Sequence, residues 1–160
     1  MRLIIAAAAT ACLASAAPAH AQSVSIQNPA NFWSTLKAMG YELSPIAKAD
    51  TTPEFDIKIE GFSSTLRLQG CTAGKDCKYM TLVASYSDVL NAPQDWIQQM
   101  NDEFDLLRVG TNEKGMLYMF GGYVVEGLPQ KELKRIFDYW GADTAAIGQE
   151  ATDKGYTTAE

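Results

Sequence analysis

The sequence predicts an α+β domain in which three amphipathic helices pack against an antiparallel sheet of five to six strands. Three stretches carry apolar residues at every third or fourth position, as one face of a helix does. Several others alternate apolar and polar residues, as half-buried strands do. These stretches follow the order helix, three or four strands, helix, two strands, helix, which is typical of an antiparallel sheet covered by helices.

The first helix is predicted from Asn28 to Gly40. Asn28 is a favourable N-cap, Pro29 suits the first turn and Gly40 suits the end of a helix. The apolar positions between them are Phe32, Trp33, Leu36 and Met39. Their spacing predicts one buried face.

The first group of strands begins directly after this helix. Tyr41–Ala47 is predicted as a short edge strand because Pro45 interrupts it. Residues 55–60 and 64–69 alternate apolar and polar side chains on either side of Gly61, which predicts an antiparallel hairpin. Residues 78–86 are apolar at both odd and even positions, so this strand is expected at the centre of the sheet.

The second half repeats helix and strand patterns. A second helix is predicted after Pro93, and a third after Pro129. Between them, residues 107–111 and 116–125 are predicted to form a hairpin through the turn at 112–115. The apolar faces of the two helices are Trp96, Met100, Phe104 and Leu107 in one, and Leu133, Ile136, Phe137 and Trp140 in the other.

Each predicted helix contains one tryptophan: Trp33, Trp96 and Trp140. We interpret all three as core residues that fill the interface between helices and sheet. The alternative is that one helix keeps an aromatic edge for a partner. The three tryptophans are therefore also the candidate partner-binding residues.

Residues 1–21 have the three parts of a secretory signal peptide: a basic start, an apolar stretch and a small-residue ending. Ala19 and Ala21 are the small residues that predict cleavage before Gln22. The apolar stretch of about 15 residues is short for a membrane anchor, which needs about 20. A lipoprotein attachment at Cys12 is a minor alternative, because the sequence before it lacks the usual leucine. We therefore expect a periplasmic or secreted protein with no membrane insertion after cleavage.

The mature chain is predicted to be one domain over residues 28–147, preceded by a short linker at 22–27 and followed by a flexible polar tail at 148–160. The whole chain has a formal net charge of −6. Cleavage would remove one basic and no acidic residue, leaving 12 basic against 19 acidic residues. Such an acidic balance argues against a nucleic-acid partner.

Cleavage also leaves Cys71 and Cys77 as the only cysteines and removes His20, the only histidine. A cysteine pair in an exported protein is most simply a disulfide. The segment between them contains Gly74 and resembles a turn between two strand ends, which suits such a bond. A redox-active or metal-binding pair is the competing interpretation, and the spacing does not match the C-x-x-C pattern of such sites.

The mature residues contain no recognisable catalytic set. Serine and cysteine nucleophile systems need an imidazole base, and zinc and copper sites usually draw on histidine or cysteine. We therefore expect no enzyme, no metal and no cofactor. A pair of carboxylates could still support a small hydrolase. The candidates are Asp56 with Glu60 and Asp102 with Glu103, which we interpret as solvated faces of a strand and a helix.

Residues 31–147 resemble the YbjN-domain family, described as bacterial sensory transduction regulators. The resemblance lies in the order and spacing of five features. They are an opening helix ending in Gly40-Tyr41, a strand end at 68–71 followed by Cys77 before the next strand, the acidic helix 96–104, the turn 112–115 and the closing helix to Trp140. It implies a fold like that of type III secretion chaperones, and a homodimer or a peptide-binding module. The signal peptide and the cysteine pair set this chain apart from cytosolic members.

These observations together predict a non-catalytic, exported, chaperone-like or regulatory module. We expect a concave sheet or a helix groove to hold an apolar segment of a protein or peptide partner in the bacterial envelope. A small carboxylate-dependent hydrolase and an inhibitor of an extracellular enzyme remain the alternatives.

Overall fold

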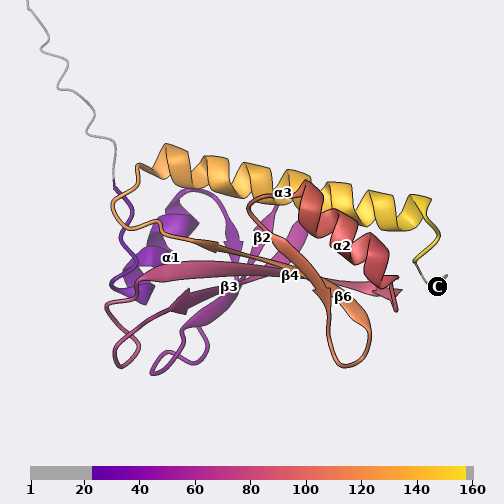
Figure 1. The fold of residues 1–160 in the computed structure, drawn as a ribbon. Helices are drawn as coiled ribbons and strands as arrows, with labels where there is room; N and C mark the ends of the chain where they lie inside the picture. The colour runs from indigo at the N-terminus through magenta and orange to yellow at the C-terminus, as the bar shows by residue number, and fades with distance from the viewer. Residues whose placement is uncertain (1–22, 158–160) are drawn as a thin grey trace, which may run out of the picture.

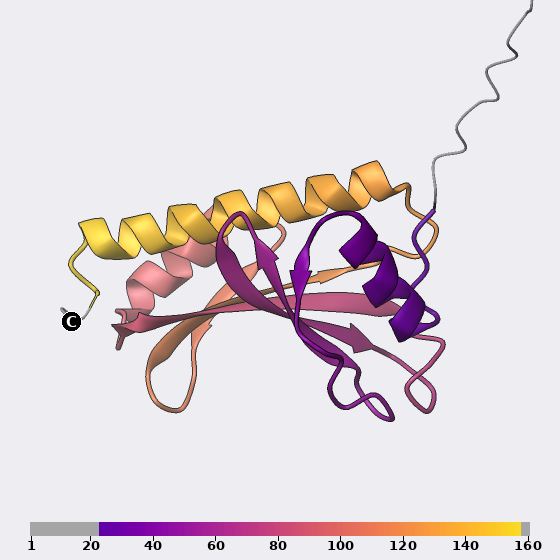
Figure 2. The same cartoon turned by 180° about the vertical axis from the view of Figure 1, so that it is seen from behind.

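The computed structural model describes residues 23–157. A twisted sheet forms one layer and three helices form the other (Figures 1 and 2). The long helix α3 runs along the length of the sheet, with α2 beside its C-terminal half and α1 near its N-terminal end (Figures 1 and 2). The predicted signal peptide, with its cleavage residues Ala19 and Ala21, lies outside the described residues.

The elements follow the predicted α+β order. They are α1 (Pro29–Ala38), β1 (Glu42–Leu43), β2 (Glu54–Ile59), β3 (Phe62–Gln69), β4 (Tyr79–Leu90), α2 (Gln94–Glu103), β5 (Arg108–Thr111), β6 (Met116–Tyr123) and α3 (Gln130–Asp153). The prediction of three helices and an antiparallel sheet of five to six strands is confirmed, with six strands present.

The strand order in the sheet is β1-β2-β3-β4-β6-β5, and every neighbouring pair is antiparallel. β4 therefore lies at the centre, between β3 and β6, as its apolar residues predict. In register, Arg67 pairs with Thr81, and Thr81 pairs with Gly122 on its other side. These three residues form one row across the middle of the sheet.

The core fills the space between the sheet and the helices. Phe32 and Leu36 of α1, Met100 of α2 and Phe137 of α3 are fully buried there. The capping residues act as predicted: Asn28 accepts hydrogen bonds from the backbone N–H groups of residues 30 and 31 at the start of α1. The helix ends before Gly40, whose φ of 96° favours glycine.

The segment before α1 is part of the core, so the prediction of a linker at 22–27 is wrong for its described residues. Val24 and Ile26 are fully buried. The Val24 N–H donates to the Leu128 carbonyl at 2.7 Å, and the Ile26 N–H donates to Glu126 Oε2 at 2.8 Å. The short alternation of apolar and polar residues from Ser23 onward was the signal that the sequence offered for this extended segment.

The prediction of a flexible polar tail at 148–160 is also wrong for its described residues, 148–157. Helix α3 continues past Ile147 to Asp153, with Ala151 fully buried. Beyond it, the Tyr156 ring meets Trp96 edge to face at 5.3 Å. These late contacts come from α2, and local polarity alone could not predict them.

Strand β4 is longer than predicted and reaches Leu90 instead of ending at Tyr86. Its pairing with β6 shifts register between these two residues, as a β-bulge does. The irregularity lets Val89 return to the core after two exposed polar positions, Ser87 and Asp88.

One face of the sheet carries no helix. The loops at 44–53, 70–78 and 112–115 project on the side opposite α3, at two ends of this face (Figures 1 and 2). We call it the uncovered face. It is formed by every second residue of the strands, including Arg67, Thr81, Val83 and Phe120, whose side chains are at least partly exposed.

Candidate functional site

The structure places the three tryptophans in structural roles. Trp140 is 1% exposed and its Nε1 donates to Ser64 Oγ at 2.9 Å. Trp96 is also buried, and its Nε1 donates to Glu150 Oε1 at 3.1 Å. The prediction that these two could bind a partner is therefore wrong, because packing between helix and sheet leaves them almost no accessible surface.

Trp33 is the exception, since it is half-buried. Its Nε1 donates to the Ser44 carbonyl at 2.9 Å, and the Lys37 ammonium lies 5.2 Å from the ring centroid. One ring edge thus ties α1 to the loop after β1. The three tryptophans do not form a common surface.

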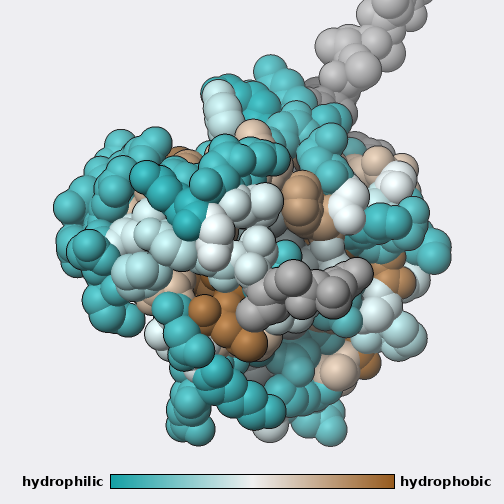
Figure 3. All heavy atoms as spheres, turned by 90° about the vertical axis from the view of Figure 1, so that its right-hand side faces the viewer, coloured by the Kyte–Doolittle hydropathy of each residue, from teal (hydrophilic) through white to brown (hydrophobic). Residues whose placement is uncertain are grey.

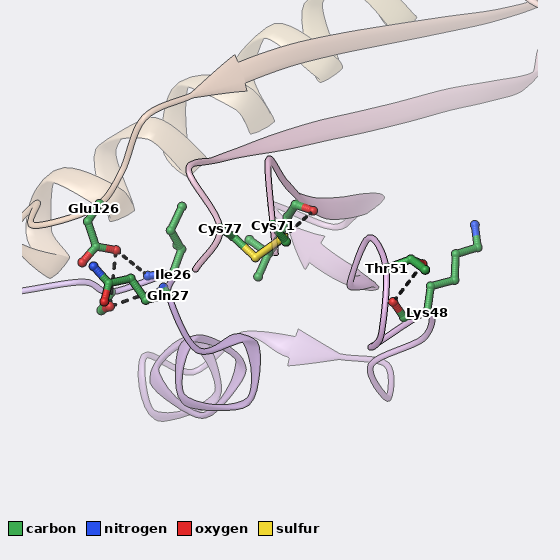
Figure 4. The surroundings of a disulfide bond; sticks show 9 residues. Ile26, Gln27, Lys48, Thr51, Cys71, Cys77 and Glu126 are labelled. Carbon is green, nitrogen blue, oxygen red and sulfur yellow. Dashed lines mark hydrogen bonds between the residues drawn. A yellow bond between two sulfur atoms is a disulfide. The ribbon is translucent and has the colours of Figure 1, made fainter. Parts of the chain in front are cut away.

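Cys71 and Cys77 form a disulfide that closes the loop between β3 and β4. Figure 4 shows this bond beside Ile26 and Gln27 of the N-terminal segment. The Asp76 N–H donates to the Gln27 carbonyl at 2.8 Å, which joins the two segments. The predicted pairing is present, and Cys77 is buried. The disulfide therefore holds one of the loops at the border of the uncovered face.

The candidate carboxylates do not form a paired site. Asp56 lies on β2 and Glu60 four residues further along, at the turn into β3, so about 13 Å of extended chain separates them. Glycosidase carboxylates lie about 5 to 9.5 Å apart. Asp102 and Glu103 are exposed neighbours on α2, and Asp102 accepts a hydrogen bond from Gln98.

No group of three or more His, Cys, Asp or Glu side chains within residues 23–157 could hold a metal ion. Over that range, no helix is both long and apolar enough to cross a membrane.

The uncovered face holds a concentration of exposed apolar side chains. Tyr79 is 41% exposed, Phe120 41%, Leu106 70% and Val124 75%. Tyr79 and Phe120 lie on the adjacent strands β4 and β6. Val124 directly follows β6, and Leu106 lies two residues before the start of β5. Viewed from the end that carries the C-terminus, the surface is mostly hydrophilic, with hydrophobic side chains gathered in small patches (Figure 3). On the uncovered face, the four exposed apolar side chains come from neighbouring strands and their ends, and contiguous exposed apolar residues can mark an interaction site.

Two hollows meet at Phe120 on this face. The larger has a volume of about 480 Å³ and lies over β3, β4 and β6. The smaller, of about 250 Å³, lies over β6 and β5. The larger is lined by Arg67, Gln69, Thr81, Val83, Ser85, Asn112, Tyr118 and Phe120. The smaller is lined by residues 105–108 and 120–122.

Arg67 is the only charged residue that lines the larger hollow. Its Nε donates to Glu54 Oε2 at 3.1 Å. The Lys48 ammonium, 2.7 Å from Glu54, and the Arg67 guanidinium hold the pKa of the Glu54 carboxyl below its usual range. Because only Nε is used, the guanidinium keeps further N–H donors for a ligand in the hollow.

The two edge strands of the sheet, β1 and β5, offer little free backbone to an added strand. At the β5 edge, the Asn101 side chain of α2 bonds both the N–H and the C=O of Val109, at 2.8 and 3.0 Å. At the opposite edge, β1 has only two residues, and Ala47 further along exchanges two backbone hydrogen bonds with Glu54 of β2. An added strand would meet the Asn101 bonds at one edge and a very short strand at the other, so the uncovered face is the larger binding surface.

Sequence reasoning expected a concave sheet or a helix groove but did not identify Arg67 or the four exposed apolar residues. The available signal was the run of apolar residues at both odd and even positions in β4 and β6. In β4 this run predicts a central strand, which the strand order confirms. The same pattern also means that apolar side chains face away from the helices, where no other layer covers them.

No protein-family model, no curated protein and no solved structure matches this chain.

Proposed function

We propose that this chain is a non-catalytic, exported binding or chaperone-like module that engages a protein or peptide partner in the bacterial envelope. The partner occupies the uncovered face of the sheet. The observation that carries this proposal is the exposure of Tyr79, Leu106, Phe120 and Val124 around two adjoining hollows. Burying such side chains against a partner stabilises a complex by removing apolar area from water.

Export is supported by the signal-like residues 1–21 and by the disulfide between Cys71 and Cys77. Disulfides persist in oxidising compartments such as the periplasm. Mass spectrometry of the exported chain is expected to give a mature start at Gln22. A start upstream of His20 would contradict the proposed cleavage.

Site-specific photocrosslinking in cells that naturally produce the protein tests the binding surface. A benzophenone amino acid replaces Phe120 in one variant, and Tyr139 in a matched control. Tyr139 is 59% exposed but lies on α3, on the opposite side of the molecule. We expect a discrete adduct from position 120 and none from position 139. Equal labelling at both positions, or none at either, would refute binding at the uncovered face.

A further inference from the structure

Gly122 is a glycine that the protein's own packing does not require. It lies inside β6, paired with Thr81 in an unbroken register, and it has no positive φ. A Cβ atom built on it would meet nothing nearer than Thr81 Cγ2, at 3.9 Å. Glycine in a strand interior costs stability, and it often marks a place where a ligand or another backbone approaches closely.

The other glycines of this part of the sheet have a packing reason. A Cβ on Gly121 would lie 2.7 Å from the Tyr123 hydroxyl, because that ring folds over it on the core side. A Cβ on Gly110 would lie 3.1 Å from the Tyr118 hydroxyl. Gly122 alone of these three leaves its space open.

The open space at Gly122 belongs to a trough across the strands. Gly122 and Thr81 are the small residues of one row, which continues through Arg67 on β3 to its ion-pair partner Glu54 on β2. Tyr79 and Phe120, each 41% exposed, stand on either side of this row. Leu106, 70% exposed, lines the smaller hollow with Gly122 and closes the other end. The β5 end therefore offers Leu106 between the oppositely charged Asp105 and Arg108, and the β3 end offers Arg67.

We propose that this trough holds an extended segment of another polypeptide, with an apolar side chain at Leu106 and an acidic side chain at Arg67. The segment passes directly over Gly122. This inference rests on the proposed function and specifies its partner. It commits to an acidic residue because the larger hollow is lined by Arg67 and by no acidic residue, in a chain with net charge −6. In the smaller hollow, the opposite charges of Asp105 and Arg108 balance each other.

The dimensions define the segment further. Leu106, Gly122, Thr81 and Arg67 lie on or beside four neighbouring strands, so the trough spans about 14 Å at about 4.8 Å per strand. An extended chain rises about 3.3 Å per residue. The apolar and acidic residues of the partner are therefore expected about four positions apart.

A peptide fits this trough better than a fatty acid, although both can combine an apolar part with a carboxylate. Binding sites for small apolar molecules bury most of the ligand in a cleft or cavity. The larger hollow here is instead a surface feature with hydroxyl and amide side chains at Gln69, Thr81, Ser85 and Asn112. These groups can bond the backbone N–H and C=O groups of a peptide.

The test uses the purified mature chain and a displayed library of random ten-residue peptides. We expect selected peptides to carry an apolar residue about four positions from Asp or Glu. Gly122→Val fills the trough and is expected to weaken binding of a selected peptide at least about tenfold in Kd. Its thermal midpoint should equal or exceed that of the wild type, because a Cβ at this position has room and valine favours a strand.

Two matched variants serve as controls. Ser63→Val adds the same side chain to an exposed position of β3 that lines neither hollow, and should leave Kd unchanged. Arg67→Gln should remove the preference for the acidic peptide over its amide analogue. Glu54→Gln breaks the same ion pair but keeps the arginine, so the preference should remain.

The outcomes separate this inference from the proposed function. Peptides that bind wild type and Gly122→Val equally, or that show no acidic preference, would overturn the trough assignment and leave a binding module in place. Displacement of a selected peptide by dodecanoate would also overturn the assignment of a peptide occupant. A library that yields no binding peptide would count against the proposed function itself.

Discussion

The hydrogen bonds of Asn101 to edge strand β5 give the most direct test of this fold. The Asn101 side chain takes the place of a neighbouring strand: its Oδ1 accepts from the Val109 N–H at 2.8 Å, and its Nδ2 donates to the Val109 carbonyl at 3.0 Å. Asn101→Ala removes both bonds. Val109 is only 5% exposed, so water has poor access to the two groups left behind.

The expected magnitude follows from these two bonds. A hydrogen bond contributes about 0.5–1.5 kcal/mol net, so Asn101→Ala should lower the free energy of unfolding by about 1–3 kcal/mol. For a domain of this size, that loss corresponds to a fall of about 4–10 °C in the thermal midpoint. Gln98→Ala is the matched control, because Gln98 lies on the same helix and bonds only the exposed Asp102. Its effect should stay within about 0.5 kcal/mol.

Asn101→Asp adds a pH dependence that a simple loss of packing would not produce. An ionised carboxylate would face the Val109 carbonyl, whereas a protonated carboxyl could donate to it as the amide does. The pKa of the introduced carboxyl is therefore expected to be raised by folding. The stability that it contributes should be fully present below about pH 4, the pKa of an unfolded Asp, and should be lost as the pH rises through the folded value.

Urea unfolding followed by far-ultraviolet circular dichroism measures both effects. The free energy of unfolding is compared for wild type, Asn101→Ala, Asn101→Asp and Gln98→Ala at pH 4 and pH 7. If Asn101→Ala were as stable as Gln98→Ala, the bonds to the edge strand would not stabilise the sheet. If Asn101→Asp lost no stability between the two pH values, the assigned donor and acceptor geometry would be incorrect.

Three further predictions concern the core and its connections. Ile26→Ala should lower the free energy of unfolding by about 2–5 kcal/mol, whereas Gln27→Ala, at an exposed position, should change it little. Equally small effects of both variants in urea unfolding would show that the N-terminal segment is a linker and not part of the core. Replacing both Cys71 and Cys77 by Ser should lower the free energy of unfolding by about 2 kcal/mol, because the unfolded chain regains the entropy that the closed loop removes. A double variant as stable as the oxidised wild type would contradict this. Burial raises the pKa of Tyr123 to about 12, so stability that is present below about pH 10 should fall as the pH rises toward 12. Tyr123→Phe should make that fall shallower in urea unfolding between pH 9 and pH 11, and an unchanged slope would refute the assigned cause.

The sequence determined the local elements because their signals lie within a few residues of one another. The Asn28 cap, the proline that follows it and the stop at Gly40 predicted α1 closely. The alternation on either side of Gly61 predicted the hairpin of β2 and β3. Element ends were predicted less well. Strand β4 passes through a polar dipeptide, and α3 continues to Asp153, because distant parts of the chain pack against them.

The bond between the two cysteines was predicted from the sequence, but its contacts were not. Short spacing and an expected oxidising compartment predicted the bond from sequence alone. Only the tertiary structure showed that the closed loop also contacts the N-terminal segment, where the Asp76 N–H meets the Gln27 carbonyl.

The candidate binding surface was decided by tertiary structure. Apolar residues at both odd and even positions predicted that β4 is central, but not which face of the sheet the helices would leave uncovered. Trp96 and Trp140 were conspicuous in the sequence and are buried. Arg67, Thr81 and Gly122 come from three separate strands, and only the register brings them into one row. Local periodicity encodes the helices and strands, whereas a surface built across strands exists only after those strands have paired.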